Sequence, residues 1–323
     1  MKIESVIGDI QRLGNPLLSC PSGRISQTLL TQPDFDAKIF KNAGEFETYY
    51  KIVSDERWKM EEKLSTENKD KHSWFTQGYC EVCDKKTEFK IERNNPKGTT
   101  PMYRSTLTCR HCALMNRRRF IAALLKKLMN GGDIKDVYVY ERITQFYKVM
   151  QEQLKNVNLV GSEYLGSDKK PGEIVKKLKV QNKIINDVRH EDALKLSFDD
   201  KSFDLVVSQD VFEHVSDINK SLKEAHRVLR NHGCLIIAIP FTFAKTTVQR
   251  AMLKDGKIQN LLPAAYHGNP LSKNGALVFF DYGWDFLDMC KSAGFTKAYM
   301  VGYYSLYYGY IGRALQVMFI AEK

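Results

Sequence analysis

No apolar run in the 323-residue sequence is long enough to span a bilayer. The best uncharged candidate, residues 298–312, is too short and too rich in tyrosine. The first residues, Met1-Lys-Ile-Glu-Ser, contain no apolar core of a signal peptide. The seven cysteines are an odd number, and four of them form two close pairs, which favours metal binding in a reducing compartment over a disulfide framework. These absences predict a cytoplasmic protein without a membrane span.

Internal repeats and low-complexity tracts are also missing, and a hydrophobic content of 43% is ordinary for a globular protein. The length allows one large domain with one or two small ones. We predict three parts. A helical N-terminal segment covers residues 1–71, a four-cysteine zinc-ribbon module covers residues 72–116, and an α/β domain covers residues 117–323.

The net charge of +11 is concentrated around the cysteine pairs. Residues 72–135 carry 13 Lys and Arg side chains against 5 Asp and Glu side chains. Such a basic module could bind an anionic partner such as nucleic acid, a nucleotide-linked sugar or an acidic polymer. A solvated face that keeps the protein soluble is an equally good interpretation.

One β-α-β unit ends in a group of ionisable side chains. Its first strand contains Leu205, Val206 and Val207, the continuous apolar run of a parallel strand covered on both faces. Four polar side chains follow this strand: Gln209, Asp210, Glu213 and His214. A helix is predicted over residues 217–230, with Gly233 as its left-handed cap, and a second apolar strand over residues 234–239. Open α/β sheets bind ligands at the carboxyl ends of their strands, so this group marks a candidate site.

Two C-x2-C pairs predict a structural metal site. Cys80 and Cys83 form the first pair, Cys109 and Cys112 the second, with turn signals between them at residues 94–98. Two such pairs on facing hairpins supply the tetrahedron of soft ligands that zinc requires. His111 could replace one cysteine, but it lies inside a pair and a four-cysteine site is favoured. Four thiolates leave no open coordination position, so the zinc is expected to be structural.

Several short motifs resemble the class I S-adenosylmethionine (SAM) methyltransferases of the type 11-like group. They run in the family's order: Ser162-Glu-Tyr-Leu-Gly166, His190-Glu-Asp-Ala-Leu194, Phe203-Asp-Leu-Val-Val-Ser-Gln-Asp210, Glu213-His-Val215, Gly283-Trp-Asp285 and Ala293-Gly-Phe295. The resemblance covers residues 137–323 and implies a Rossmann-like, mostly parallel sheet with one antiparallel strand near the carboxyl terminus. The cysteine pairs with Arg117-Arg-Arg119 resemble a zinc ribbon found ahead of some SAM methyltransferase domains.

The resemblance implies a cofactor site made by acidic residues at successive strand ends. Glu163, with Tyr164 beside it, is expected to accept hydrogen bonds from the ribose hydroxyls. Asp192, with Ala193 alongside, fits the position that receives the adenine amino group. Gln209 and Asp210 are expected beneath the sulfonium, and Glu141 at the methionyl amino group. The family's first turn is normally rich in glycine, whereas Arg142-Ile-Thr-Gln-Phe146 contains none.

Methyl transfer from SAM depends mainly on in-line positioning and desolvation, and a hydroxyl or amine acceptor can also need a base. His214, with Glu213 beside it, is the first candidate base and His267 the second. Asp210, Glu213, His214 and His267 together resemble the metal-binding pattern of ubiquinone-pathway O-methyltransferases and small-RNA 2′-hydroxyl methyltransferases. A second divalent metal that activates the acceptor is therefore a further hypothesis.

The sequence favours methyl transfer from SAM to an oxygen or nitrogen of a small molecule or glycan. One alternative is an RNA methyltransferase that binds nucleic acid through the basic zinc module. A non-catalytic binding module that kept the fold and lost the cofactor is the other, because the first turn lacks glycine.

Overall fold

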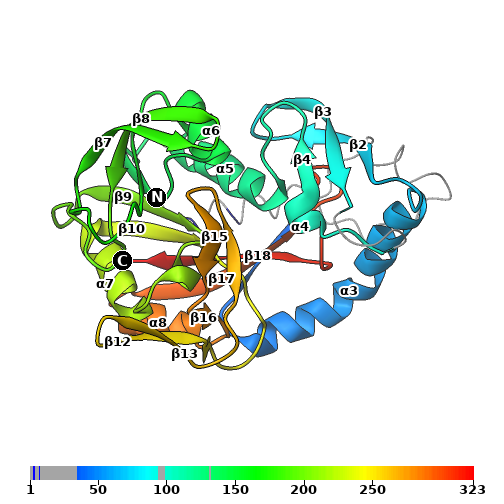
Figure 1. The fold of residues 1–323 in the computed structure, drawn as a ribbon. Helices are drawn as coiled ribbons and strands as arrows, with labels where there is room; N and C mark the ends of the chain where they lie inside the picture. The colour runs from blue at the N-terminus through cyan, green and yellow to red at the C-terminus, as the bar shows by residue number, and fades with distance from the viewer. Residues whose placement is uncertain (1–2, 4–6, 8–34, 94–98, 131) are drawn as a thin grey trace. The chain divides into compact units, whose positions relative to one another are not determined.

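The structure is a computed structural model that describes residues 3, 7, 35–93, 99–130 and 132–323 (Figure 1). The chain divides into two compact units, each built from several stretches of sequence. The first unit comprises Met1–Phe40, Gly44–Asp133 and Val301–Val317. The second comprises Lys41–Ala43, Ile134–Met300 and Met318–Lys323.

The second unit contains a Rossmann-like sheet with the strand order β17-β18-β10-β9-β5-β6-β8-β7. These strands are β5 (Asp136–Val139), β6 (Asn158–Glu163), β7 (Ile174–Val180), β8 (Lys183–His190), β9 (Phe203–Gln209), β10 (Leu229–Ala238), β17 (Lys297–Tyr304) and β18 (Gln316–Glu322). Neighbouring strands from β10 through β9, β5 and β6 to β8 are parallel. Their side chains form the core, and Leu205, Val206 and Val207 are completely buried.

Strand β18 pairs antiparallel with β10, so the predicted mostly parallel sheet with an antiparallel strand near the carboxyl terminus is confirmed. A second antiparallel pairing, between β7 and β8, was not predicted. Gln181 at the turn between them has a φ of 52°, and β7 carries three lysines, Lys176, Lys177 and Lys179, among its aliphatic residues. This pattern suits a hairpin at the edge of a sheet, where lysine discourages further strand pairing.

Four short helices complete the α/β part: α6 (Gln145–Gln153), the 3₁₀ turn η1 (Phe212–His214), α7 (Ile218–Val228) and α8 (Phe286–Ser292). Helix α7 begins because the Asp217 side chain accepts a hydrogen bond from the Lys220 amide. The helix ends at Val228, and the left-handed residue after it is His232 (φ 67°) instead of the predicted Gly233. Gly233 is still required, because a Cβ there would lie 2.9 Å from the Asp204 carbonyl oxygen.

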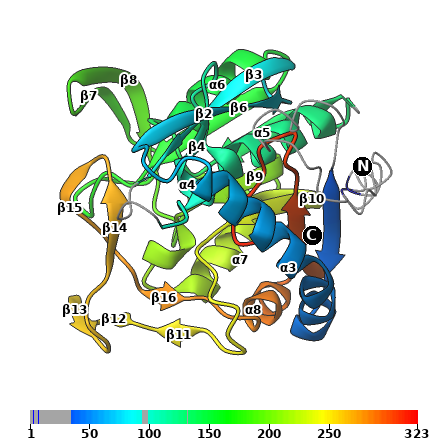
Figure 2. The same cartoon turned by 90° about the vertical axis from the view of Figure 1, so that its right-hand side faces the viewer.

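Three small two-stranded sheets lie between β10 and α8 in the sequence. They pair β11 (Val248–Gln249) with β16 (Phe280–Asp281), β12 (Ala251–Lys254) with β13 (Lys257–Asn260), and β14 (Tyr266–Asn269) with β15 (Ser272–Leu277). All pairings are antiparallel. Figure 2 shows the β12–β13 hairpin standing away from the main sheet of its unit.

The first unit holds the four-cysteine module. Its elements are β1 (Asp36–Phe40), α3 (Ala43–Thr66), β2 (Ser73–Cys80), β3 (Lys85–Glu92), α4 (Tyr103–Thr106), β4 (Leu107–Cys109) and α5 (Asn116–Met129). Strands β2, β3 and β4 form an antiparallel sheet, and the predicted turn at residues 94–98 lies outside the described residues. Within residues 1–71, the described part contains helix α3 and strand β1. No helix among the described residues is long and apolar enough to cross a membrane.

Candidate functional site

The carboxyl ends of the central parallel strands carry paired polar side chains. Glu141, just after β5, accepts a hydrogen bond of 2.6 Å from the side-chain amide of Gln209 at the end of β9. Both side chains are buried, with exposed fractions of 5%. Strands β5 and β9 are parallel neighbours, so this bond follows directly from the sheet topology.

Glu163 fixes the turn after β5, residues 142–146, which contains no glycine. Its Oε1 accepts hydrogen bonds from the backbone amides of Arg142 (2.8 Å) and Ile143 (2.9 Å). Burial raises the pKa of Glu163 to about 7, and the two backbone hydrogen bonds work in the opposite direction. A glycine does contribute nearby, because a Cβ at Gly161 would lie 2.7 Å from the Glu141 carbonyl oxygen. The turn is therefore positioned by an acid and a glycine on the neighbouring strand β6.

Further polar side chains lie at the carboxyl end of β8, the parallel neighbour of β6. Glu163 and His190 are register partners between β6 and β8. The rings of Tyr164 and His190 lie 5.5 Å apart, and Tyr164 is 57% exposed. Asp192 forms a local turn in which its Oδ1 accepts a hydrogen bond from the Leu194 amide at 2.9 Å. Ala193 lies in this turn. Adjacent strands thus place Glu163, Tyr164 and Asp192 in one region.

Asp210 follows β9 in a left-handed conformation. Its φ is 52°, a region that non-glycine residues other than Asn and Asp rarely adopt. Its amide donates a hydrogen bond to the Ala238 carbonyl at 2.8 Å, which fixes the turn against the end of β10. Left-handed residues of this kind occur often at functional sites.

A second cluster forms just beyond β9. Glu213 and His214 come from η1 and His267 comes from β14, and one ligand atom from each lies within 4.8 Å of the others. The Glu213 Oε1 lies 3.5 Å from His267 Nδ1 and 3.7 Å from His214 Nε2. Glu213 is completely buried, and neither of its carboxylate oxygens has a hydrogen-bond partner among the described residues. Asp210 is not part of this cluster, which contains three of the four residues suggested by the sequence.

The backbone orients His214. Its Nδ1 lies 2.8 Å from the Leu277 carbonyl oxygen. A carbonyl can only accept, so Nδ1 carries the proton and Nε2 presents a lone pair toward Glu213 when the ring is neutral. The buried carboxylate and this imidazole nitrogen can hold a proton or a cation between them.

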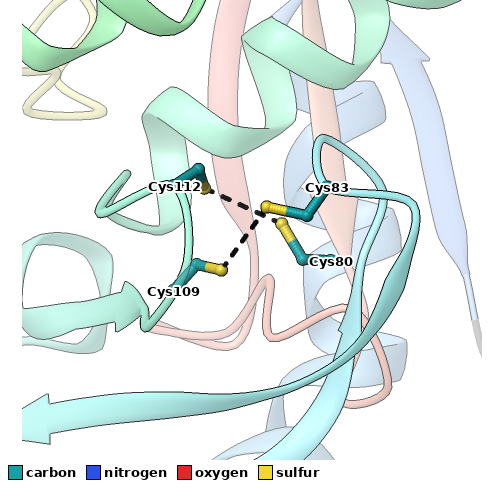
Figure 3. A group of neighbouring side chains, drawn as sticks. All are labelled: Cys80, Cys83, Cys109 and Cys112. Atoms are coloured by element: carbon teal, nitrogen blue, oxygen red, sulfur yellow. Dashed lines mark hydrogen bonds between the residues drawn. The ribbon is translucent and has the colours of Figure 1, made fainter.

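The four predicted cysteines of the first unit lie together (Figure 3). The Sγ atoms of Cys80 and Cys112 are 3.9 Å apart, as are those of Cys83 and Cys109. A zinc tetrahedron with Zn–S bonds of about 2.3 Å has S···S edges of about 3.8 Å, so this donor set fits zinc. Behind the first pair, Lys126 Nζ donates to the carbonyl oxygens of Glu81 and Val82. Because His111 is not part of the cluster, the four-cysteine alternative holds.

The sequence did not predict the hydrogen bonds that position Glu163 and His214. It missed the hydrogen bonds from the Arg142 and Ile143 amides to Glu163 and the Leu277 carbonyl behind His214. The hydrogen bonds to Glu163 could have been predicted. The amides of the turn after β5 need an acceptor, and Glu163 is an acid at the end of the next strand. The Leu277 contact depends on how the β14–β15 hairpin returns to η1, which no local pattern encodes.

Residues 149–237 match a family model described as a methyltransferase domain. This stretch of the chain is therefore similar to methyltransferase domains. The match covers β6 to β10, including Glu163, Asp192, Gln209, Asp210, Glu213 and His214.

The chain is also similar to a curated protein. The chain is 29% identical over 133 residues to a ubiquinone biosynthesis O-methyltransferase of Pelagibacter ubique (strain HTCC1062), a match that covers 35% of this chain and 55% of that protein. The chain thus spans about half the length of this relative.

Solved structures with a similar arrangement are also methyltransferases. A Burkholderia thailandensis 1,6-didemethyltoxoflavin-N1-methyltransferase, solved with 1,6-didemethyltoxoflavin and S-adenosylhomocysteine, is 14% identical, with 61% of this chain and 76% of that chain covered and a TM-score of 0.33. An S-adenosylmethionine dependent methyltransferase of Mesorhizobium loti is 13% identical, with 59% and 91% covered and a TM-score of 0.34. Likenesses this distant carry no argument about the function of this chain.

Proposed function

We propose that the protein transfers a methyl group from SAM to an oxygen or nitrogen atom of a small molecule or glycan. The observation that carries the proposal is the row of acidic and amide side chains at the carboxyl ends of β5, β6, β8 and β9, inside or beside the matched methyltransferase domain. This is the edge of an open α/β sheet at which ligands bind.

The proposed cofactor contacts follow from which oxygen atoms are already used. Glu163 Oε1 is occupied by two backbone amides, so Oε2 is the atom proposed to accept the ribose hydroxyls. Asp192 Oδ1 is occupied by the Leu194 amide, so Oδ2 is proposed to face the adenine amino group, with Ala193 and Tyr164 beside the ring. Glu141, positioned by Gln209, is proposed to bind the methionyl amino group, and Asp210 to lie beneath the sulfonium.

When bound, SAM supplies an activated methyl group, so the chain itself needs to orient the acceptor and remove its proton. We propose that His214 Nε2 or His267 accepts that proton, and that Glu213 stabilises the imidazolium which results. A completely buried carboxylate without hydrogen-bond partners among the described residues is suited to this role, because a neighbouring cation offsets its desolvation.

The same three residues also suit a divalent cation. One carboxylate and two imidazoles are a mixed oxygen and nitrogen donor set, which Mn²⁺, Fe²⁺ and Zn²⁺ accept. The hydrogen bond of His214 Nδ1 to the Leu277 carbonyl resembles the outer contact that fixes metal-binding histidines. As an alternative to the histidine base, we propose a second divalent ion held by Glu213, His214 and His267, where it would polarise an acceptor hydroxyl.

Calorimetry with SAM and S-adenosylhomocysteine tests the cofactor proposal. We expect micromolar affinity for both. Glu163→Ala should weaken binding by about 2–4 kcal/mol, because two charge-assisted hydrogen bonds are lost. Glu173→Ala is the matched control, since Glu173 is an acid at the start of β7 whose carboxylate lies 3.6 Å from Lys169. Wild-type affinity in Glu163→Ala would contradict the ribose assignment, and no binding by the wild type would favour a non-catalytic module.

Electron paramagnetic resonance of added Mn²⁺ tests the second ion without an acceptor. The zinc-loaded wild type should bind Mn²⁺, and Glu213→Gln and His267→Asn should each weaken binding at least about tenfold. Asp210→Asn should leave Mn²⁺ affinity unchanged, because Asp210 lies outside the cluster. Equal Mn²⁺ affinity in the wild type and Glu213→Gln would leave the histidines as simple bases.

A further inference from the structure

The β12–β13 hairpin of the second unit exposes large aliphatic side chains. Leu253 is 52% exposed and Ile258 is 57% exposed, and the two are register partners facing each other across the hairpin. Leu261 and Leu262, directly after the hairpin, are 46% and 40% exposed. Scattered exposed aliphatic residues are ordinary, whereas a contiguous group marks a binding surface.

The hairpin has two chemically different faces. Side chains alternate along each strand, so Leu253 and Ile258 share one face with Ala251 and Asn260. The opposite face of the same pairing carries Lys254 and Lys257 next to the tip. We call the segment from Lys245 to Pro263 the tip segment. It contains four cationic residues and a single acid, Asp255.

This composition selects among the partners that could cover the tip segment. A second copy of the chain would bring two Lys254–Lys257 pairs together, and like charges at close range oppose that contact. Nucleic acid would attract the lysines but would leave the leucine and isoleucine side chains without an apolar contact. An anionic lipid bilayer satisfies both, because aliphatic side chains enter the acyl boundary while lysines remain among the headgroups.

The tip segment is rigidly attached to the proposed catalytic cluster. The Arg250 guanidinium, inside the segment, donates to Asp281 at 2.6 Å and to the carbonyl oxygen of Pro263, the last residue of the segment, at 2.8 Å. The Arg250 amide donates to the Phe279 carbonyl, and the Phe279 amide donates to the Glu213 carbonyl. A surface held in this way docks without first having to become ordered, which favours binding.

We propose that the tip segment docks the protein on the surface of an anionic lipid bilayer, with Leu253 and Ile258 inserted and Lys254 and Lys257 at the headgroups. This is attachment at one face of a membrane and not a span. It is independent of the methyl transfer proposed above.

Sedimentation of the full chain with lipid vesicles tests the proposal. The wild type should bind vesicles of phosphatidylcholine mixed with phosphatidylglycerol and should bind pure phosphatidylcholine much more weakly. Leu253→Ser/Ile258→Ser should weaken binding to the mixed vesicles at least about tenfold. Lys254→Gln/Lys257→Gln should weaken it by roughly thirtyfold at low salt.

The β7–β8 hairpin supplies matched controls in the same unit. Ile174 and Ile184 are 40% and 66% exposed, so Ile174→Ser/Ile184→Ser removes comparable apolar surface. Lys177→Gln/Lys179→Gln removes two exposed charges from β7. Both controls should keep wild-type affinity for the mixed vesicles.

Three results would overturn the proposal. One is a wild type that does not sediment with mixed vesicles, and another is a control pair that loses as much affinity as the tip pairs. The third is a wild-type dimer in analytical ultracentrifugation that Leu253→Ser/Ile258→Ser converts to monomer, which would assign the tip segment to self-association. Unchanged thermal unfolding of Lys254→Gln/Lys257→Gln excludes misfolding as the cause of its loss.

Discussion

Glu163 combines two tasks that other folds of this kind divide between a glycine-rich turn and an acid. One carboxylate oxygen fixes the Arg142 and Ile143 amides, and the other is left for the proposed ribose contact. The glycine-free turn is therefore not evidence that the cofactor site has been lost. SAM carries no phosphate that would accept hydrogen bonds from the amides of this turn. The Glu163 carboxylate accepts them instead.

The pH dependence of SAM binding follows from the same residue. Burial raises the pKa of Glu163 from its usual range to about 7, so the carboxyl group is largely protonated in the free protein at pH 6. Ribose hydroxyls donate best to the ionised form. We expect SAM affinity to rise as the pH increases from 6 to 8, as measured by calorimetry. Glu163→Gln should bind SAM more weakly than the wild type, and its affinity should not rise with pH. If SAM affinity rises equally in the wild type and in Glu163→Gln, another group is responsible for the pH dependence.

At the scale of elements, helix α3 stabilises an unusual loop of the first unit. Gly312, Arg313 and Ala314 have φ values of 126°, 55° and 59°. Left-handed conformations cost roughly 1–2 kcal/mol per non-glycine residue. Glu61 of α3 offsets this, because its Oε1 accepts hydrogen bonds from the Gly312 amide at 2.8 Å and the Ala314 amide at 3.2 Å.

Glu61 should make stability depend on pH. Its exposed fraction is 1%, and burial raises its pKa from an ordinary value of 4.5 to about 7. A carboxyl group with a raised folded-state pKa contributes stability below pH 4.5 and loses that contribution as the pH rises through 7. Glu61→Gln keeps an acceptor without a charge, so urea unfolding should show it less destabilised relative to wild type at pH 8 than at pH 5. Glu61→Ala should be destabilised at both pH values, by about 1–3 kcal/mol. A constant difference between wild type and Glu61→Gln would contradict the assignment.

The zinc ribbon should behave as a metal-dependent element. Purified protein is expected to contain about one zinc per chain, measured by elemental analysis. Cys80→Ser or Cys112→Ser should unfold the ribbon, because metal binding in such modules supplies folding free energy. Proteolysis should then also reach residues 305–314, since Tyr310 donates to Glu81 inside the first cysteine pair and Tyr79 donates to the Tyr307 carbonyl. Cys234→Ser, at a buried cysteine outside the cluster, is the control for zinc content. Freshly isolated protein that contains no zinc would contradict the expected content of about one zinc per chain.

The elements that sequence could predict are those with strong local periodicity. The strand through Leu205–Val207, helix α7 and the cysteine pairs all carry their signal within a few residues. The β7–β8 hairpin was missed because β7 is an exposed, lysine-rich edge strand without a buried residue, so its sequence carries little apolar periodicity. Likewise, the approach of His267 to Glu213 depends on a hairpin more than fifty residues later in the chain, and only tertiary structure brings them together.

At the scale of the whole molecule, the structure explains why a net charge of +11 does not by itself imply nucleic-acid binding. Several cations around the cysteine pairs have internal partners. Arg93 and Arg119 are buried and donate to backbone carbonyls, and Lys126 donates to the carbonyls of the first cysteine pair. Lys90, Arg110 and Lys127 form ion pairs with Glu92, Glu88 and Glu81. Charges used in this way are less available to an anionic polymer.

The salt dependence of RNA binding distinguishes the two acceptor classes. Each phosphate neutralised on a single strand contributes about 0.7 to the slope of log affinity against log salt. If about two phosphates are contacted, the affinity for single-stranded RNA should fall by less than about tenfold between 50 and 200 mM salt. Lys85→Gln/Lys86→Gln, at exposed positions of β3 next to the first cysteine pair, should reduce RNA affinity no more than Lys177→Gln/Lys179→Gln on β7. A thousandfold fall with salt, together with a selective loss in Lys85→Gln/Lys86→Gln, would instead assign RNA as the acceptor, because only a ribbon that grips many phosphates produces both results.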